Sequence, residues 1–284
     1  MLVSVIIAAY DEERAIDDCL RALLNQRFHG KKDLNCEVIV VANGCTDTTA
    51  DKARAWIKCF ADAGMRLSIV ESASAGKSNA LNLGDQAASG DVMLYLDADV
   101  TCEDRLVFEI SEALKTREPR FATGTLTIRP PFSKISRIYG EIWSQISSTN
   151  DSTTGCGFYA VNRAGRERWD RFPAIHSDDK FVRLNFLPSE RTRVNARYIW
   201  PLPEGLSNLI RVRRRWCEGN SELRARYPAF RERESRQNDR NKLISRLIFK
   251  KPVGLSVFIL IYVSSRVLAY FRPVDQPILW RRGR

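Results

Sequence analysis

The sequence predicts an α/β fold in which a mostly parallel sheet carries helices on both faces and is followed by a helical, apolar C-terminal extension. Three observations support this prediction. Through the first hundred residues, apolar runs of strand length alternate with stretches of helical periodicity. A polar loop follows each of these runs. Near the end of the chain, an apolar stretch of almost membrane-spanning length predicts the extension.

The first half is expected to follow a βαβαβαβ order, which is typical of right-handed, doubly wound sheets. Uninterrupted apolar runs indicate buried strands at residues 2–9, 37–42, 66–71 and 91–96. Apolar residues at three- and four-residue spacing indicate helices at residues 16–24, 46–60 and 78–88. Thr46 or Thr48 is the expected cap of the second helix.

The second half is less regular and has the pattern of an α+β arrangement. Strands are expected at residues 121–130, 153–161 and 193–200, and helices at residues 177–187 and from about Leu206 onward. The chain contains no internal repeat and no low-complexity linker. We therefore expect one main domain followed by an extension.

The cysteines argue against a disulfide framework or a zinc site. There are seven, an odd number, with no CxxC pair. This usage suits a reducing compartment. The first residues also lack the basic region of a signal peptide, so a cytoplasmic location is expected.

Positive charge is concentrated in one segment of the chain. The net charge is +11, and residues 211–251 hold fourteen basic and five acidic residues. Such a segment suits nucleic acid, anionic lipid or a phosphorylated substrate. It contains few interleaved aromatic residues and no recognition motif, so we expect no nucleic-acid partner.

A pair of carboxylates ends the fourth predicted strand. Asp97 and Asp99 are separated only by Ala98. Ligands of doubly wound sheets bind at the carboxyl ends of the strands, which brings together the loops at residues 9–13, 42–47, 72–78 and 97–99. There, two carboxylates suit a divalent cation such as Mg²⁺ or Mn²⁺. The alternative is an ordinary turn that leads into a helix.

Two glycine-containing motifs resemble familiar nucleotide-binding loops but do not fit them fully. The AGKS around Lys77 is not a Walker A loop, because position 71 is Glu. Lys77 is then either a contact to phosphate or a solvated lysine. Gly155 and Gly157 fit a dinucleotide pattern, but no apolar strand precedes them, and a close approach of the backbone to a ligand is the better interpretation.

A second acidic pair begins a predicted helix. Either carboxylate of Asp178 and Asp179 suits a base that accepts the proton of a hydroxyl. The alternative is helix capping after Ser177. Further on, Arg215 and Trp216 lie in an arginine-rich helix, where guanidinium groups suit the charge of a departing diphosphate or a solvated helix face.

In order and spacing, these motifs resemble those of the inverting family 2 glycosyltransferases. The resemblance rests on VSVIIAAYDEERAIDDCLRALLNQ, VIVVANGCTDTT, GKSNALNLG, DVMLYLDADV, TGCGFYAVNR and the SDDKFV helix start, and covers about residues 2–220. It implies a GT-A (Rossmann-like) fold in a bacterial-like enzyme. That enzyme moves a sugar from a nucleoside-diphosphate sugar, with UDP-sugar as the expected donor, to a glycan or lipid-linked acceptor.

The resemblance also implies a domain division and roles for individual residues. The catalytic domain is residues 1–220, with a nucleotide-binding half (1–100) and an acceptor half (101–220); residues 221–284 form a basic linker and an apolar helix. Donor contacts are expected from Ala9, Tyr10, Glu12, Asn43, Asp47, Lys77 and Asp97. Asp97 and Asp99 are expected to hold Mg²⁺ or Mn²⁺. Asp179 is the expected catalytic base, with Asp178 beside it. Leaving-group and acceptor contacts are expected from Gly155, Gly157, Arg215 and Trp216.

Two departures from the family pattern affect these expectations. Ala42 and Asn43 stand where acidic residues are frequent, which leaves the donor nucleotide open. Val212 replaces the glutamine of the Gln-x-x-Arg-Trp motif found in processive members. We therefore expect a non-processive enzyme.

Residues 253–271 predict membrane association. They are largely apolar, with Arg266 as their one charged residue, and are flanked by Lys250, Lys251 and Arg272. Such a helix either spans the bilayer or lies in its interface, next to an anionic inner leaflet. The alternative is packing on the catalytic domain. Together with membrane association, the resemblance implies an envelope or exopolysaccharide role at the inner face of the plasma membrane.

Two other functions remain as alternatives. A nucleotidyltransferase with the same fold begins with a glycine-rich, arginine-containing loop, which AAYDEERA lacks. A non-catalytic module that binds nucleic acid or membrane would not need both acidic pairs.

Overall fold

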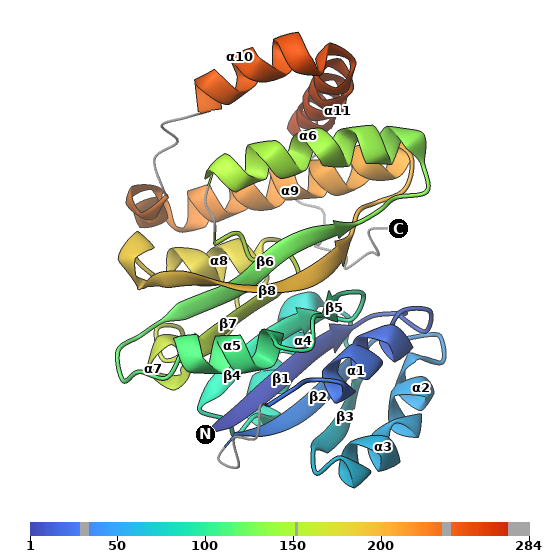
Figure 1. Cartoon of the computed structure of the whole chain (residues 1–284), viewed down its shortest axis with the longest axis vertical. Coiled ribbons are helices and arrows are strands. Elements are labelled where there is room, and N and C mark those ends of the chain that lie inside the picture. The colour runs from blue at the N-terminus through green and yellow to red at the C-terminus, as the bar shows by residue number, and fades with distance from the viewer. Residues whose placement is uncertain (29–33, 151–152, 235–239, 272–284) are drawn as a thin grey trace.

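The computed structural model describes residues 1–28, 34–150, 153–234 and 240–271. Within these residues, eight strands form one sheet in the order β3-β2-β1-β4-β7-β6-β8-β5 (Figure 1). The strands are β1 (Leu2–Ala9), β2 (Asn35–Asn43), β3 (Arg66–Ser72), β4 (Val92–Asp97), β5 (Thr101–Cys102), β6 (Phe121–Arg129), β7 (Phe158–Asn162) and β8 (Arg191–Pro201). The predicted α/β fold is confirmed.

The sheet is parallel in its first half and mixed in its second. The strands β3, β2, β1 and β4 pair in parallel, as do β6 and β8. By contrast, β7 is antiparallel to β4 and β6, and β5 is antiparallel to β8. The chain passes from β1 to β2 on one side and later returns to β4 on the other. The carboxyl ends of β1 and β4 are therefore neighbours at a switch point of the sheet.

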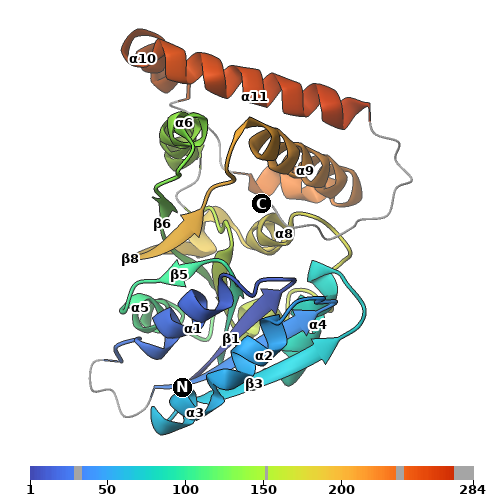
Figure 2. The same ribbon diagram turned by 90° about the vertical axis from the view of Figure 1, so that its right-hand side faces the viewer.

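Helices cover both faces of the sheet. They are α1 (Ile16–Leu24), α2 (Thr49–Ala55), α3 (Ile57–Asp62), α4 (Lys77–Ala87), α5 (Leu106–Ala113), α6 (Lys134–Asn150), α7 (Arg163–Arg166), α8 (Asp178–Leu184), α9 (Leu206–Arg226), α10 (Arg240–Lys250) and α11 (Pro252–Tyr270), with 3₁₀ turns at Pro188–Glu190 and Pro228–Arg233. Figure 2 shows α6, α9 and α11 stacked on the side of the molecule where β6 and β8 lie. Helix α9 continues without interruption through residue 220.

Two local predictions need correction. The helix predicted over residues 46–60 is two helices, which meet at Trp56. Trp56 is held there because its indole N–H donates a 2.8 Å hydrogen bond to Asp17 of α1. Neither threonine caps by its side chain, although Thr48 occupies the cap position. Ser177 likewise precedes α8 without a side-chain capping bond.

The strand β1 is buried on both faces, which explains its uninterrupted apolar run. Val3, Val5 and Ile7 pack in the same cluster as residues of α1, whereas Ile6 packs in the cluster that holds Ala80 and Leu81 of α4. Alternate side chains of a strand point to opposite faces. The first half of the chain is therefore a three-layer sandwich.

The close contact between α4 and β1 predicts the effect of one substitution. A Cβ atom at Gly84 would lie 2.2 Å from Cγ2 of Ile6. We expect Gly84→Ala to lower the free energy of unfolding by about 1–3 kcal/mol, the range for overpacking. Urea denaturation measures this loss. With Ile6→Ala, which removes the clashing atom, the double variant should lose less than the sum of the two single losses; a full sum would contradict the predicted contact.

Candidate active site

Three polar side chains from distant parts of the chain meet at the switch point of the sheet. Lys77 begins α4, Asp97 ends β4 and Asp178 begins α8. Lys77 Nζ lies 2.8 Å from Asp97 Oδ1 and 3.1 Å from Asp178 Oδ1. Burial by itself lowers the pKa of Lys77, but the charges of Asp178 and Asp97 outweigh it and hold that pKa well above its usual range. Lys77 is therefore a fixed positive charge between the two acidic pairs.

The two residues of the second acidic pair have different surroundings. Asp178 is buried, and its Oδ2 accepts a 3.0 Å hydrogen bond from the hydroxyl of Tyr159. Asp179 is partly accessible, and its Oδ1 accepts a 2.7 Å bond from the backbone N–H of Lys180. Burial raises the pKa of Asp179 to about 6, and the charge of Asp178 adds to this effect while Lys77 opposes it. The oxygens of Asp178 are thus bonded within the fold, whereas the side chain of Asp179 is partly accessible at the cavity wall.

A cavity of about 460 Å³ joins both acidic pairs with the predicted leaving-group and acceptor residues. The predicted site residues that line it are Lys77, Asp97, Asp99, Gly155, Gly157, Asp178, Asp179, Arg215 and Trp216. They come from five separate parts of the fold, so only the folded chain brings them together.

Gly157 lets the backbone pass closely beside Asp97. Its φ is +69°, and an added Cβ would lie 3.1 Å from Asp97 Oδ2. The carbonyl of Gly157 also accepts a 2.9 Å hydrogen bond from the Asp97 N–H. Gly155 is nearly as crowded, with Cβ of Tyr159 at 3.2 Å from an added methyl group. Both glycines thus allow close packing within the protein, and the predicted close approach of this backbone to a ligand stays a prediction.

The long helix α9 closes the cavity on one side. Gly219 makes this possible, because a Cβ there would lie 2.5 Å from Oγ of Ser177. From the same helix, Arg215 faces the acids. Burial lowers the pKa of Arg215, while the charges of Asp97, Asp178 and Asp99 raise it. The net effect leaves a guanidinium group charged, since its usual pKa is above 12.

Three tryptophans line the same cavity. The ring centroid of Trp143 lies 5.5 Å from that of Trp200 and 6.2 Å from that of Trp216, and the last two are 5.9 Å apart. Trp143 and Trp200 were not among the predicted site residues. The helical spacing of Ile135, Tyr139 and Ile142 indicates the helix α6. The sequence does not indicate that this helix lies beside the cavity.

The remaining predicted donor residues lie outside this cavity, at the carboxyl ends of β1 and β2. Ala9 is buried, and Tyr10 and Glu12 are partly accessible. Asn43 is fully buried. Its side-chain amide is satisfied there, since it donates a 2.7 Å hydrogen bond to the carbonyl of Gly76 and accepts a 2.8 Å bond from the side chain of Asn79. Asn43 thereby ties β2 to the loop before α4.

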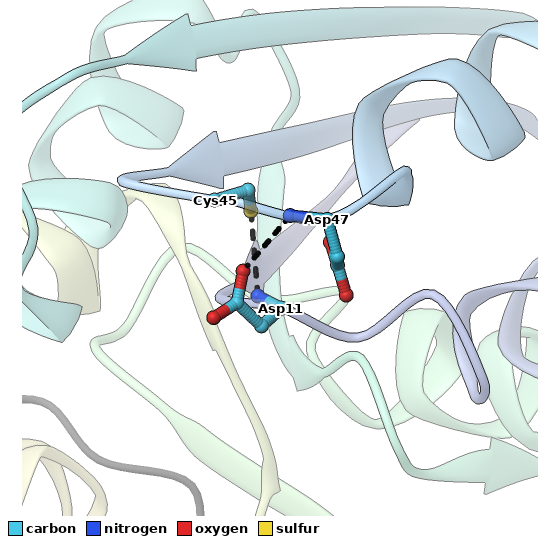
Figure 3. Close-up of side chains that lie close together, drawn as sticks. All are labelled: Asp11, Cys45 and Asp47. Carbon is cyan, nitrogen blue, oxygen red and sulfur yellow. Dashed lines mark hydrogen bonds between the residues drawn. The ribbon is translucent and has the colours of Figure 1, made fainter.

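Asp47 belongs to a group that connects the two loops. One ligand atom each of Asp11, Cys45 and Asp47 lies within 4.8 Å of the others (Figure 3). Asp11 accepts a 3.3 Å bond from the Asp47 N–H and donates its own N–H to the Cys45 sulfur at 3.4 Å. These bonds hold the loops at residues 9–13 and 42–47 together. The group mixes thiol and carboxylate ligands, whereas Mg²⁺ prefers oxygen.

Asp97 and Asp99 fit a divalent cation better. Both line the cavity, both are partly accessible, and both offer oxygen ligands. Lys77 contacts Oδ1 of Asp97, while Oδ2 faces Gly157.

A second cavity, of about 520 Å³, lies between β6 and α6 and shares Trp143 and Thr154 with the first. It contains neither acidic pair, so we assign the chemistry to the smaller one.

Comparison with known proteins gives a consistent result. Residues 4–168 match the model of the family described as glycosyl transferase family 2. The chain is 28% identical over 236 residues to the Bacillus subtilis (strain 168) protein named "Probable glycosyltransferase YdaM", covering 77% of this chain and 55% of that protein. The chain thus spans about half the length of this relative.

Solved structures share the fold. A mannosyltransferase from Pyrobaculum calidifontis in complex with GDP-Man and Mn²⁺ has a TM-score of 0.57 at 17% identity, over 96% of this chain and 76% of that one. TarS 1-349 of S. aureus in complex with UDP has a TM-score of 0.53 at 14% identity, over 92% and 81%. The expected GT-A fold is confirmed.

Proposed function

The chain belongs to glycosyl transferase family 2, and from that premise we propose that it transfers a sugar from a nucleoside-diphosphate sugar to an acceptor hydroxyl by one inverting displacement. The enzyme class, a glycosyltransferase, follows from the family. One observation carries the finer proposal: Asp179, with a pKa near 6, lines the same cavity as Asp97 and Asp99.

Asp179 is the general base. At neutral pH a carboxyl group with a pKa near 6 is mostly ionised, yet it is a stronger base than an ordinary aspartate. It accepts the proton as the acceptor oxygen attacks the anomeric carbon. Asp178 does not take that proton, because Lys77 and Tyr159 already occupy its oxygens. It holds Lys77 and keeps the pKa of Asp179 raised.

The leaving diphosphate is stabilised on the opposite side of the sugar. Asp97 and Asp99 would hold Mg²⁺ or Mn²⁺, and the cation would supply Lewis-acid stabilisation of the departing charge. Arg215 adds a fixed positive charge beside them. Because a single displacement occurs from the face opposite the leaving group, the anomeric configuration inverts.

The nucleotide binds over the carboxyl ends of β1 and β2. The partly accessible Tyr10, Glu12 and Asp47 would contact the nucleotide by their side chains, and the buried Ala9 and Asn43 would contribute backbone to that edge. A UDP-sugar is the proposed donor, in line with the UDP bound to TarS. The GDP-Man of the Pyrobaculum enzyme makes guanine the alternative to test.

The proposed acceptor is a lipid-linked glycan or polysaccharide precursor at the inner face of the plasma membrane. The three tryptophans offer flat apolar surfaces to the acceptor side of the cavity. Residues 1–220 would form the catalytic domain and residues 221–284 the membrane-associated extension. Arg236, Arg272 and the rest of 235–239 and 272–284 lie outside the described residues.

Nucleotide binding gives the direct test. We expect one of UDP, GDP, TDP and CDP, together with Mn²⁺, to raise the Tm by roughly 5–10 °C at saturating concentration, since a ligand stabilises the native state it binds. Asp99→Asn should remove the Mn²⁺-dependent part of the shift. Differential scanning fluorimetry measures both effects.

Asp62→Asn, an exposed substitution on α3, is the matched control and should keep the full shift. If no nucleotide shifts the Tm of folded protein at any Mn²⁺ concentration, the donor site is degenerate and the proposed function fails.

A further inference from the structure

The helix α11 has two apolar faces with different environments. Leu255, Phe258, Ile261 and Ser265 form a buried stripe at three- and four-residue spacing. On the other side, Val253, Leu260, Val263 and Val267 are 69%, 56%, 51% and 48% exposed. A helix that only packs on a soluble domain has polar residues on its outer face. The outer face of α11 therefore calls for an apolar environment.

The buried stripe is anchored to α6 and α9. Arg213 of α9 lies against the rings of Phe258 and Tyr262, at 5.1 and 4.6 Å from the centroids. The same guanidinium donates a 2.8 Å hydrogen bond to the hydroxyl of Tyr139 on α6. Tyr139 in turn stacks on Phe258 with centroids 5.4 Å apart. One partly buried arginine thus connects three helices.

Two further contacts fix the start of α11 on α6. Lys251 Nζ lies 2.7 Å from Glu141 Oε2. Gly254 brings the backbone close to α6, since an added Cβ would lie 3.1 Å from Ile142 Cδ1. Figure 2 shows α11 running along α9 rather than projecting away from the domain.

The charged residues of the segment that holds α10 and α11 are all basic. Residues 240–271 contain six Lys or Arg and no Asp or Glu. Next to the apolar stripe, α10 contributes Ile248 and Phe249, which are 51% and 86% exposed. An apolar strip bordered by cations is complementary to the surface of an anionic bilayer.

We propose that α10 and α11 dock on an anionic bilayer in the plane of its interface, with the outer stripe of α11 inserted and the inner stripe still packed on α6 and α9. By length and composition, α11 could also cross a membrane. Crossing would require α11 to leave the domain, and that would expose Phe258 and remove the aromatic contacts of the partly buried Arg213. In-plane docking keeps all of these contacts.

Vesicle binding tests the surface. We expect the full chain to sediment with vesicles that contain phosphatidylglycerol, to bind pure phosphatidylcholine vesicles at least tenfold more weakly, and to be released by salt. Leu260→Glu/Val267→Glu should reduce binding about tenfold or more, because both positions lie on the inserted stripe. Ile57→Glu, at an exposed apolar position on α3, should bind normally.

A zero-length carbodiimide cross-link between Lys251 and Glu141 tests the orientation. Docking in the plane preserves this pair, so mass spectrometry should find the cross-link in equal yield in free and vesicle-bound protein. The Lys180–Glu234 pair, at 2.5 Å, is the reference for reaction efficiency. Loss of the Lys251 cross-link upon binding would indicate a spanning helix and overturn the proposal.

The proposal would also be overturned if the protein did not bind vesicles or bound them regardless of their charge. It would equally be overturned if the protein were a dimer and Leu260→Glu/Val267→Glu dissociated it, because the exposed stripe would then join two copies of the chain. The inference rests on the proposed function in one respect only, which is that docking would bring the active site to an acceptor at the membrane. Vesicle binding needs no turnover, so its failure is distinguishable from the failure of nucleotide binding.

Discussion

Replacing Asp179 with asparagine is expected to lower kcat by roughly 10²–10⁴-fold, the contribution of a well-placed general base. The asparagine side chain has nearly the same shape as aspartate, but it cannot take up the proton of the acceptor hydroxyl. Donor binding should persist, since Asp97 and Asp99 are unchanged. Initial rates of sugar transfer, together with Tm shifts by the donor nucleotide, separate the two effects.

The pH dependence gives an independent signature of the same group. Asp179 must be ionised to act as a base, and burial raises its pKa to about 6. We therefore expect kcat/KM of the unmodified enzyme to fall as the pH drops below about 6 and to level off above it. In Asp179→Asn this limb of the profile should disappear.

Asp170→Asn makes the same chemical change at an exposed position and should leave both rate and profile unchanged. An Asp179→Asn enzyme that keeps more than half of its activity would show that another group accepts the proton.

Replacing Lys77 with methionine is expected to lower the free energy of unfolding by about 2 kcal/mol at pH 8 and to abolish activity. Breaking a fully buried ion pair costs about 3–5 kcal/mol; the side chains of Lys77 and Asp97 are 23% and 32% exposed, so solvent screening reduces the figure. Without Lys77, the carboxylates of Asp97 and Asp178 lose the ammonium group that lies between them. Urea denaturation at two pH values measures the loss.

The sign of the pH effect follows from the charges. The pKa of Asp179 is already raised, and removal of Lys77, which opposes that rise, raises it further. The folded variant therefore takes up protons that the unfolded chain does not, and its stability falls as the pH rises through this range. The difference from the unmodified enzyme should be largest at pH 8 and smaller at pH 5.5.

Lys52→Met is the matched control, because Lys52 pairs with Asp17 at 3.5 Å on the surface, with 42% and 38% exposed side chains. It should change stability by less than about 1 kcal/mol. Equal losses for the two variants would mean that Lys77 is not the central charge of the site.

The sequence by itself determined the strands and helices of the nucleotide-binding half. Each of the four strands predicted there lies within two residues of its observed bounds. The reason is local: a strand buried on both faces must be an uninterrupted apolar run, and such runs are visible without any tertiary information. Where a distant contact intervened, as Asp17 does at Trp56, the local pattern predicted one helix and the chain forms two.

The tertiary structure alone decided which charges meet. Asp97 and Asp178 are eighty-one positions apart, yet a single lysine contacts both. No spacing rule connects β4, α4 and α8; the order of strands in the sheet does. Asn43 shows the same limit, since the sequence does not reveal that its amide bonds to Gly76 and Asn79 within the fold.

The C-terminal helix shows most clearly what the sequence determines and what only the tertiary structure determines. Its composition determined that it is apolar and flanked by cations, but spanning, interfacial and packed helices share that composition. The contacts of Arg213 with Phe258 and Tyr262 hold one stripe of α11 on the domain and leave the opposite stripe exposed. Which face of a helix is free depends on its neighbours in space, and neighbours in space are what a linear sequence does not show.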